Sequence, residues 1–424
     1  MLDEVRRPAS AVSPLTSGIG FFAFWAALAV LVGWGALDTL RCAILACAIA
    51  ATAMAIVELL VFRVSYSEST GLDWSTAPRE NGPRIFTKLA GLAATLAAVA
   101  AAYWVLPVYR GEFYLPFYQA LAIIVPLWLA LAFPYFWYVD RRQREPYDGY
   151  WHMGLLVTGR AASADRGAIA QHLLGWLVRA YFLPLMLVYL VLNIDWLRFA
   201  AFNPRADWLF VYEGAFRLTI IVDLAFSVIG YALALRITDS HLRSVDSTMF
   251  GWLVTLVCFE PFWSLINSSY LNYENGRGWS ALFPDGGLLA WVWGGAIIAL
   301  LVVYSWSTVV FGLRFSNLTH RGIITSGPYR WLRHPAYLSK SLSAWLIAVP
   351  FIPAGVAPME AVRLSALLLL LNGVYFLRAW TEERHLRRDP VYVRYADWID
   401  RHGLVARLRR LTPVVSFSRR KKLV

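Results

Sequence analysis

The feature that most constrains this chain is a series of apolar segments, many of them about 20 residues long with one charge or none. A helix of that length crosses the ~30 Å hydrocarbon core of a bilayer, where every backbone polar group must be bonded internally. Only 16% of the residues are charged, against roughly 25% in soluble domains, so one large soluble core is excluded. The pattern predicts an all-α, polytopic transmembrane helical bundle.

We expect about ten spans. In chain order they cover residues 18–36, 42–62, 86–107, 117–139, 173–193, 210–235, 249–268, 287–311, 336–353 and 361–380. The fifth contains Arg179 and the sixth contains Glu213, Arg217 and Asp223, so these two are less uniformly apolar than the others.

The basic residues predict the orientation, because loops rich in Arg and Lys stay in the cytoplasm. They gather at the N-terminus and in the even-numbered loops, as Arg6, Arg7, Arg63, Arg79, Arg84, Lys88, Arg141, Arg142, Arg144, Arg160, Arg166, Arg236, Arg243, Arg314, Arg321, Arg330 and Arg333. Both termini are therefore expected to be cytoplasmic. Residues 1–17 are polar and show no cleavable signal peptide, which favours a bacterial cytoplasmic membrane and leaves an internal eukaryotic membrane open.

The net charge of +12 comes largely from these loops and from a C-terminal tail that ends in Arg419, Arg420, Lys421 and Lys422. Such a tail is expected to attract anionic membrane lipids. A nucleic-acid partner is not expected, because no folded basic domain is present, and no obligate protein partner is inferred. The three cysteines lie in apolar segments and are interpreted as packing residues rather than disulfide or zinc ligands.

The chain divides into two parts that differ in composition and in the pattern of their segments. Residues 1–286 hold the first seven expected spans, without an internal repeat, and their role is unknown. From residue 287 a long span leads into a loop dense in Arg, His, Gly and Pro, followed by a helical hairpin and a charged helix. Residues 287–424 are therefore treated as a second domain.

The loop of this second domain reads Thr-Ser-Gly-Pro-Tyr-Arg-Trp-Leu-Arg-His-Pro-Ala-Tyr over residues 325–337. Gly327-Pro328 interrupts any helix, and Pro335 suits the first position of the next one. The free N–H groups of such a helix start, beside Arg333 and His334, favour an anion. The same features also suit an ordinary basic loop capped by a proline.

A second polar element follows the hairpin and reads Arg-Ala-Trp-Thr-Glu-Glu-Arg-His-Leu over residues 378–386. Arg378 and Glu382 are four residues apart and share one helix face, with His385 near it, while Glu383 can pair with Arg387. Taken alone, this is typical of a solvated helix leaving the membrane. The hairpin, however, brings both elements to the same membrane edge, with Tyr329, Trp331 and Tyr337 between them.

In combination these motifs resemble the isoprenylcysteine carboxyl methyltransferase family and its membrane relatives, which include phospholipid N-methyltransferases. The resemblance covers about residues 287–411 and rests on Gly327-Pro328-Tyr329, Arg333-His334-Pro335-Ala336-Tyr337, Arg378 with Glu382-Glu383 and Leu386, and the pair Tyr392 and Tyr395. Two features depart from the family pattern: Asp389-Pro390 stands where Phe-Gly is usual, and about seven spans precede the domain.

The resemblance implies a methyltransferase that uses S-adenosylmethionine and takes a lipophilic acceptor from the bilayer. The expected cofactor-binding residues are Tyr329, Arg333, His334, Pro335, Tyr337, Leu338, Glu382 and Glu383. Arg378 and Glu382 are the expected catalytic residues: Arg378 would bind an acceptor carboxylate, and Glu382 could take the proton of an amine or thiol. The acceptor atom itself stays open.

The first part also holds polar residues at membrane depth, where charges are costly and face a partner or a cavity. They are Glu213, Arg217, Asp223 and Glu260, with Asp239, His241, Arg243 and Asp246 at the membrane edge. One interpretation is internal ion pairing that fixes helix packing. The other is a chamber that recognises a polar headgroup.

Two other functions remain open at this stage. Membrane sterol reductases have a related hairpin, about ten spans and an Arg-His-Pro-like motif, and they use NADPH; the Glu pair after Arg378 favours the methyltransferase. A transporter or flippase is the second alternative, although no repeated pair of interrupted helices is found.

Overall fold

The computed structural model describes residues 6–274, 278–352 and 357–411. The predicted all-α class is confirmed, since described strand is limited to the short antiparallel pair β1 (Ser244–Val245) and β2 (Thr319–His320). Eight helical segments are long and apolar enough to cross a membrane. Their helices are α1 (Pro14–Trp34), α2 (Thr39–Ile56), α3 (Gly82–Val105), α4 (Leu115–Asp140), α6 (Arg166–Phe202), α7 (Trp208–Ala232), α10 (Leu288–Val309) and α12 (Pro358–Leu386).

The count of ten spans is not confirmed, because two of the expected segments are not single long helices. Residues 249–268 form two short helices, α8 (Met249–Leu256) and α9 (Phe262–Ser269), which meet next to Pro261. Proline lacks the N–H that a continuous helix needs and clashes with the preceding turn.

The expected span 336–353 is the shorter helix α11 (Pro335–Ala348), whose 14 residues extend only ~21 Å. It stops at Val349, which has φ 40° and precedes Pro350, a position where the helical conformation is disfavoured. The last part of this expected span, residue 353, and the tail 412–424 lie outside the described residues.

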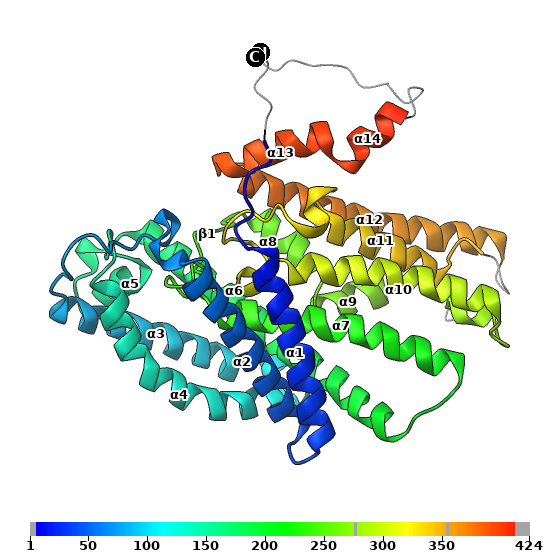
Figure 1. Cartoon of the computed structure of the whole chain (residues 1–424), viewed down its shortest axis with the longest axis horizontal. Coiled ribbons are helices and arrows are strands. Elements are labelled where there is room, and N and C mark those ends of the chain that lie inside the picture. Colours follow the sequence, from blue (N-terminus) through cyan, green and yellow to red (C-terminus); the bar gives the residue numbers. More distant parts are fainter. Residues whose placement is uncertain (1–5, 275–277, 353–356, 412–424) are drawn as a thin grey trace.

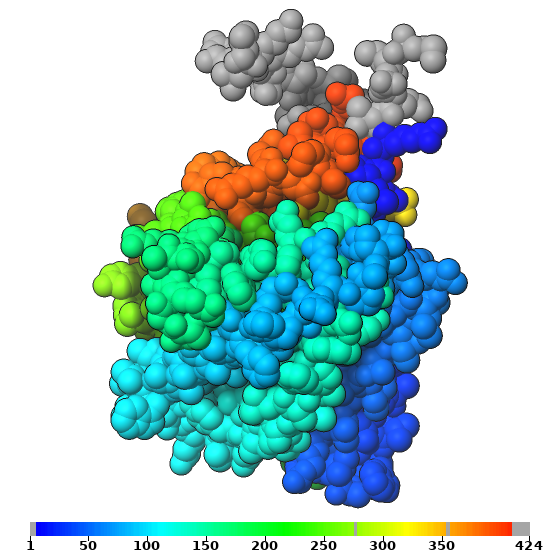
Figure 2. Space-filling model, turned by 90° about the vertical axis from the view of Figure 1, so that its left-hand side faces the viewer, coloured from blue at the N-terminus to red at the C-terminus, as the bar shows by residue number. Residues whose placement is uncertain are grey.

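The remaining helices lie at the periphery (Figure 1). They are α5 (Gly149–Val157), which packs on α3, and α13 (Pro390–His402) with α14 (Leu404–Leu411), which follow α12. Figure 2 shows α13 and α14 as a layer across one end of the molecule, next to the N-terminal segment. The cytoplasmic position of both termini stays a prediction.

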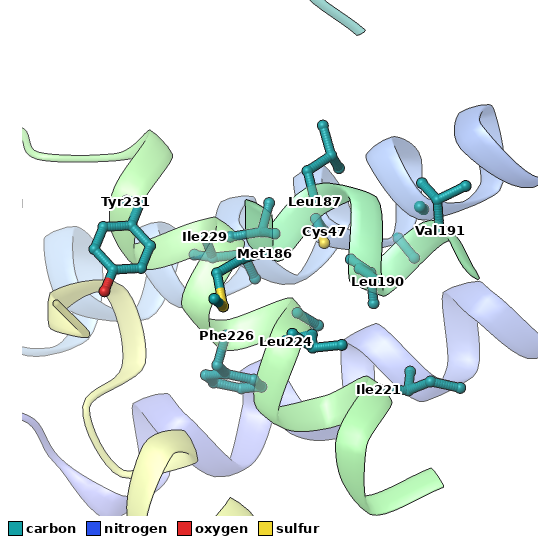
Figure 3. Packing of buried hydrophobic residues seen from close by; sticks show 14 of the residues in the cluster. Cys47, Met186, Leu187, Leu190, Val191, Ile221, Leu224, Phe226, Ile229 and Tyr231 are labelled. Carbon is teal, nitrogen blue, oxygen red and sulfur yellow. The ribbon is translucent and has the colours of Figure 1, made fainter. Parts of the chain in front are cut away.

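The largest apolar core is formed mainly by α1, α2, α6 and α7. Figure 3 shows Met186 and Leu190 of α6 facing Leu224 and Phe226 of α7, with Cys47 of α2 close by. Cys42 and Cys47 are buried in this core, and all three cysteines are free. This core holds α7 in place, and α7 in turn packs against α10 of the second domain.

A buried arginine fixes the loop between α10 and α11. Arg321 is 3% exposed and donates hydrogen bonds to five backbone carbonyls, those of Gly230, Leu233, Ser240, Leu313 and Phe315. At Gly230 a Cβ would lie 2.2 Å from the Phe315 carbonyl oxygen, so only glycine allows this approach. The loop is thus tied to the end of α7.

We expect Arg321→Met to destabilise the protein by about 3 kcal/mol or more, because each buried carbonyl left without a donor costs about 1–3 kcal/mol. Thermal unfolding of the detergent-purified protein measures this effect. Arg330→Met is the matched control, since Arg330 is exposed. Equal unfolding midpoints for the two variants would contradict the bracing role of Arg321.

Candidate active site

A pocket opens where the two parts of the chain meet. The second domain contributes residues of α10, α11, α12 and the loop before α11, including Tyr329, His334, Tyr337, Arg378 and Glu382. The first part contributes Met186 of α6, Asp223 and Ser227 of α7, and Asp246, Thr255 and Phe259 of the segment around α8. Residues 1–286 therefore supply one wall of the pocket.

The loop motif enters this site through a sharp turn. Gly327 has φ +58°, and a Cβ there would lie 2.5 Å from a methyl carbon of Val310, so glycine is required for both reasons. Residues 327–330 form a single 3₁₀ turn, and α11 then begins at Pro335, as the sequence predicts. His334 and Tyr337 lie on either side of this helix start, with rings stacked at 5.7 Å between centroids.

Glu383 closes the loop onto α12. Its carboxylate accepts hydrogen bonds from Arg333 Nη1 at 3.1 Å, His334 Nε2 at 3.0 Å and Arg387 Nη2 at 3.2 Å. The predicted pair of Glu383 with Arg387 is present. Burial alone lowers the pKa of Arg333, but the carboxylates of Glu383 and Asp400 outweigh it and raise that pKa, so the guanidinium stays charged.

Glu382, the neighbouring residue, faces the pocket. Its Oε2 accepts a hydrogen bond of 3.0 Å from the Tyr337 hydroxyl, which joins α12 to α11. The Tyr337 ring stacks on Tyr375 at 6.3 Å and 11°. Tyr337 thus lines the pocket beside the Glu382 carboxylate, and Tyr375 supports its ring by stacking.

Arg378 lies one turn before Glu382 and is only 6% exposed. Its Nη2 donates to Asn317 Oδ1 at 3.2 Å, and its guanidinium lies over the rings of Tyr337 at 5.2 Å and Phe259 at 5.3 Å. Within the described residues its Nε is buried without a hydrogen-bond partner. A buried donor without a partner is costly, which is typical of a group that meets a ligand.

Five of the predicted site residues, those named above for the second domain, line the pocket. The other four do not line it. Arg333 and Glu383 belong to the hydrogen-bonded cluster of Arg333, His334, Glu383 and Arg387, which we call the closing cluster. Pro335 is buried at the start of α11, and Leu338 is 45% exposed. Trp331, expected between the two motifs, instead lies against Trp306 at 5.9 Å.

The tyrosine pair, Tyr392 and Tyr395 of α13, packs against the loop that carries Tyr329. Both rings are buried in a cluster with Ile323 and Ile399, and Tyr395 donates a 2.7 Å hydrogen bond to the backbone carbonyl of Tyr329. Burial raises the pKa of Tyr392 and of Tyr395, so both phenols stay protonated and able to donate. Asp389-Pro390 stands where the family usually has Phe-Gly, but the contacts of the two tyrosines with the loop are still formed. Asp389 caps the start of α13.

The polar residues at membrane depth separate into two groups. Glu213 and Arg217 form an ion pair at 2.6 Å, and Arg217 also lies over Trp196, so internal pairing describes them. Glu260 accepts a hydrogen bond from the Ser264 hydroxyl at 2.6 Å. Asp223 does not join them: it lines the pocket and accepts hydrogen bonds from Thr308 at 2.5 Å and Tyr304 at 3.2 Å.

Several pocket residues were missed from the sequence. Lys340 is three residues after Tyr337, and this helical spacing alone could have placed both on one face. Asn317, Phe259 and Tyr304 carry no such signal, because they reach the pocket from segments far apart in the chain.

Comparison with known proteins matches the part of the chain that carries this geometry. Residues 289–388 match the model of the isoprenylcysteine carboxyl methyltransferase (ICMT) family. This supports a membrane methyltransferase in general, and members of that family use S-adenosylmethionine as methyl donor. The match covers α10, α11 and α12 and leaves out the first part of the chain. Comparisons with the curated proteins and with the solved structures returned no match.

Proposed function

We propose that the protein is an integral-membrane methyltransferase that transfers a methyl group from S-adenosylmethionine to a lipophilic acceptor bearing a carboxylate, an amine or a thiol. One observation carries this proposal. A hydrogen bond between Tyr337 and Glu382 joins the two sequence motifs across one pocket, beside the buried, incompletely bonded Arg378.

The residues of the pocket fit the parts of the cofactor. A sulfonium and an ammonium suit the carboxylate of Glu382 and the faces of Tyr329 and Tyr337, since aromatic rings attract cations. A carboxylate suits the start of α11, where Pro335 occupies the first position and His334 precedes it. Arg333 and Glu383 would act through the loop that they hold against α12, rather than by lining the pocket.

When bound, the cofactor supplies an electrophilic methyl carbon on a positively charged sulfur. The acceptor atom forms a bond to that carbon while the carbon–sulfur bond breaks, and the sulfur keeps the electron pair. Arg378 would orient an acceptor carboxylate. With an amine or thiol, the proton released would go to Glu382. The walls of the pocket exclude water and align the two reactants.

The surroundings of the pocket support a lipophilic acceptor. Helices α7, α10 and α12 belong to segments of membrane-spanning length and line it. An acceptor could thus reach it sideways from the bilayer. The basic loops favour a cytoplasmic position for the motif end, in a membrane of the bacterial inner-membrane type.

Calorimetric titration of the detergent-purified protein with S-adenosylhomocysteine, and separately with NADPH, tests the cofactor. We expect saturable binding of S-adenosylhomocysteine and none of NADPH. The reverse result would move the protein to the reductase class. Binding of neither would overturn the proposal and direct attention to the first part of the chain.

A further inference from the structure

Part of the pocket is lined by α7, α10 and α11, and this part holds Lys340, which the proposed reaction does not use. Lys340 lies on α11, one turn beyond Tyr337, and lines the pocket together with Asp223 of α7 and with Tyr304 and Thr308 of α10. Helix α10 packs against both α7 and α11, and α7 and α10 are of membrane-spanning length, so these residues sit among packed, largely apolar helices. A charge in such a setting is costly and is expected to serve a partner or a ligand.

Lys340 has no such partner within the described part of the chain. Its ammonium makes no hydrogen bond or ion pair there. It lies over the ring faces of Tyr375 at 5.3 Å and Tyr304 at 5.9 Å, and it interacts electrostatically with Asp223 without direct contact. Lysine carries three donors and no acceptor. These donors face the pocket without a protein acceptor.

The nearby carboxylate is already satisfied. Each oxygen of Asp223 accepts a hydrogen bond, Oδ1 from Thr308 and Oδ2 from Tyr304. Asp223 and Lys340 attract each other electrostatically, but no hydrogen bond or ion pair joins them among the described residues. The ammonium donors of Lys340 therefore still lack an acceptor in direct contact, and an anionic group bound in the pocket would supply one.

We infer that Lys340 binds an anionic group, a carboxylate or a phosphate, of the acceptor molecule, at a subsite separate from the atom that is methylated. This inference rests on the proposed function. It narrows the acceptor class: a plain hydrocarbon tail would leave the ammonium without a partner, so the buried portion of the acceptor carries an anionic group. Specificity for the acceptor then depends on a residue outside the two motifs.

The test uses the full-length protein in nanodiscs of zwitterionic phosphatidylcholine, saturated with S-adenosylhomocysteine so that the cofactor's own carboxylate site is filled. Radiolabelled decanoate, decyl phosphate, decanol and decylamine are the probes, and binding to empty nanodiscs is subtracted. We expect decanoate or decyl phosphate to bind at least roughly tenfold more tightly than decanol or decylamine, and the tighter of the two identifies the group.

Lys340→Met should weaken the anionic probe roughly tenfold to hundredfold, the usual effect of losing one charge-assisted hydrogen bond. Lys340→Arg keeps the charge and should retain binding even if the methionine variant fails to fold. Arg363→Met is the matched control, because Arg363 pairs with Glu360 on the exposed face of α12.

Three results would overturn the inference. They are equal anion binding by wild type and Lys340→Met, preferential binding of decylamine, and a loss in Lys340→Met of S-adenosylhomocysteine affinity instead of probe affinity, which would assign the lysine to the cofactor. Failure of the wild type to bind S-adenosylhomocysteine at all would instead count against the proposed function, so the two failures are distinguishable.

Discussion

Replacing Arg378 by Gln, or Glu382 by Gln, is expected to reduce methyl transfer at least about 100-fold while the protein still inserts and folds. Both residues line the pocket: the buried Nε of Arg378 has no hydrogen-bond partner among the described residues, and Glu382 accepts a hydrogen bond from Tyr337. Both groups would therefore contact the reacting molecules. The measurement is transfer of tritiated methyl from S-adenosylmethionine into the organic-extractable lipid of membranes that contain the protein.

Matched controls on the same helix are Arg384→Gln and Glu360→Gln. Arg384 bonds to Thr248 and lies over Trp380, and Glu360 pairs with the exposed Arg363, so neither lines the pocket. Both controls should retain turnover. Near-normal turnover in the Arg378 and Glu382 variants would remove their assigned roles.

Glu383→Gln is expected to abolish measurable binding of S-adenosylhomocysteine. The carboxylate joins Arg333 and His334 of the loop to Arg387 at the end of α12. Its removal leaves Arg333 with Asp400 and the backbone carbonyl of Ala396 as partners among the described residues. A neutral amide cannot balance the charges of Arg333 and Arg387, so the loop that carries Tyr329 and His334 should lose its fixed position. Calorimetry of wild type and variant measures the difference, which we expect to exceed 100-fold, about 2.8 kcal/mol or more.

The control for this variant is its unfolding temperature. Asp400→Asn removes the other carboxylate that contacts Arg333, from a far more exposed position, and should weaken binding much less. Cofactor affinity in Glu383→Gln equal to that of wild type would show that the closing cluster does not organise the cofactor site.

Much of the fold followed from local signals. Eight of the expected segments coincide with long apolar helices, because a run of about 20 apolar residues has no other way to satisfy its backbone in a bilayer. The two expected spans that are not single long helices are interrupted next to prolines. Helix α11 ends just before Pro350, and Pro261 separates α8 from α9. Because the residues around both prolines are apolar, hydropathy alone predicted continuous spans there.

The site was predictable where spacing decides it. Pro335 begins α11, and Arg378 and Glu382 share the face of α12 that turns toward the pocket. Spacing could not predict that Glu382 lines the pocket while Glu383 binds Arg333 and His334. Successive helix residues point about 100° apart, so Glu382 and Glu383 must differ, but only the packing of α12 against α11 decides which one faces Tyr337.

By itself the sequence determined that this is a helical membrane protein with two polar motifs at one end of a hairpin, because span length, proline position and helical spacing are local properties. The tertiary structure decided that the first part of the chain forms a wall of the same pocket. Asp223, Phe259 and Asn317 meet Lys340 and Arg378 there only because α10 packs against α7 and α11 while α12 packs against α11 and α8. Contacts between segments far apart in the chain produce no periodic pattern in the sequence.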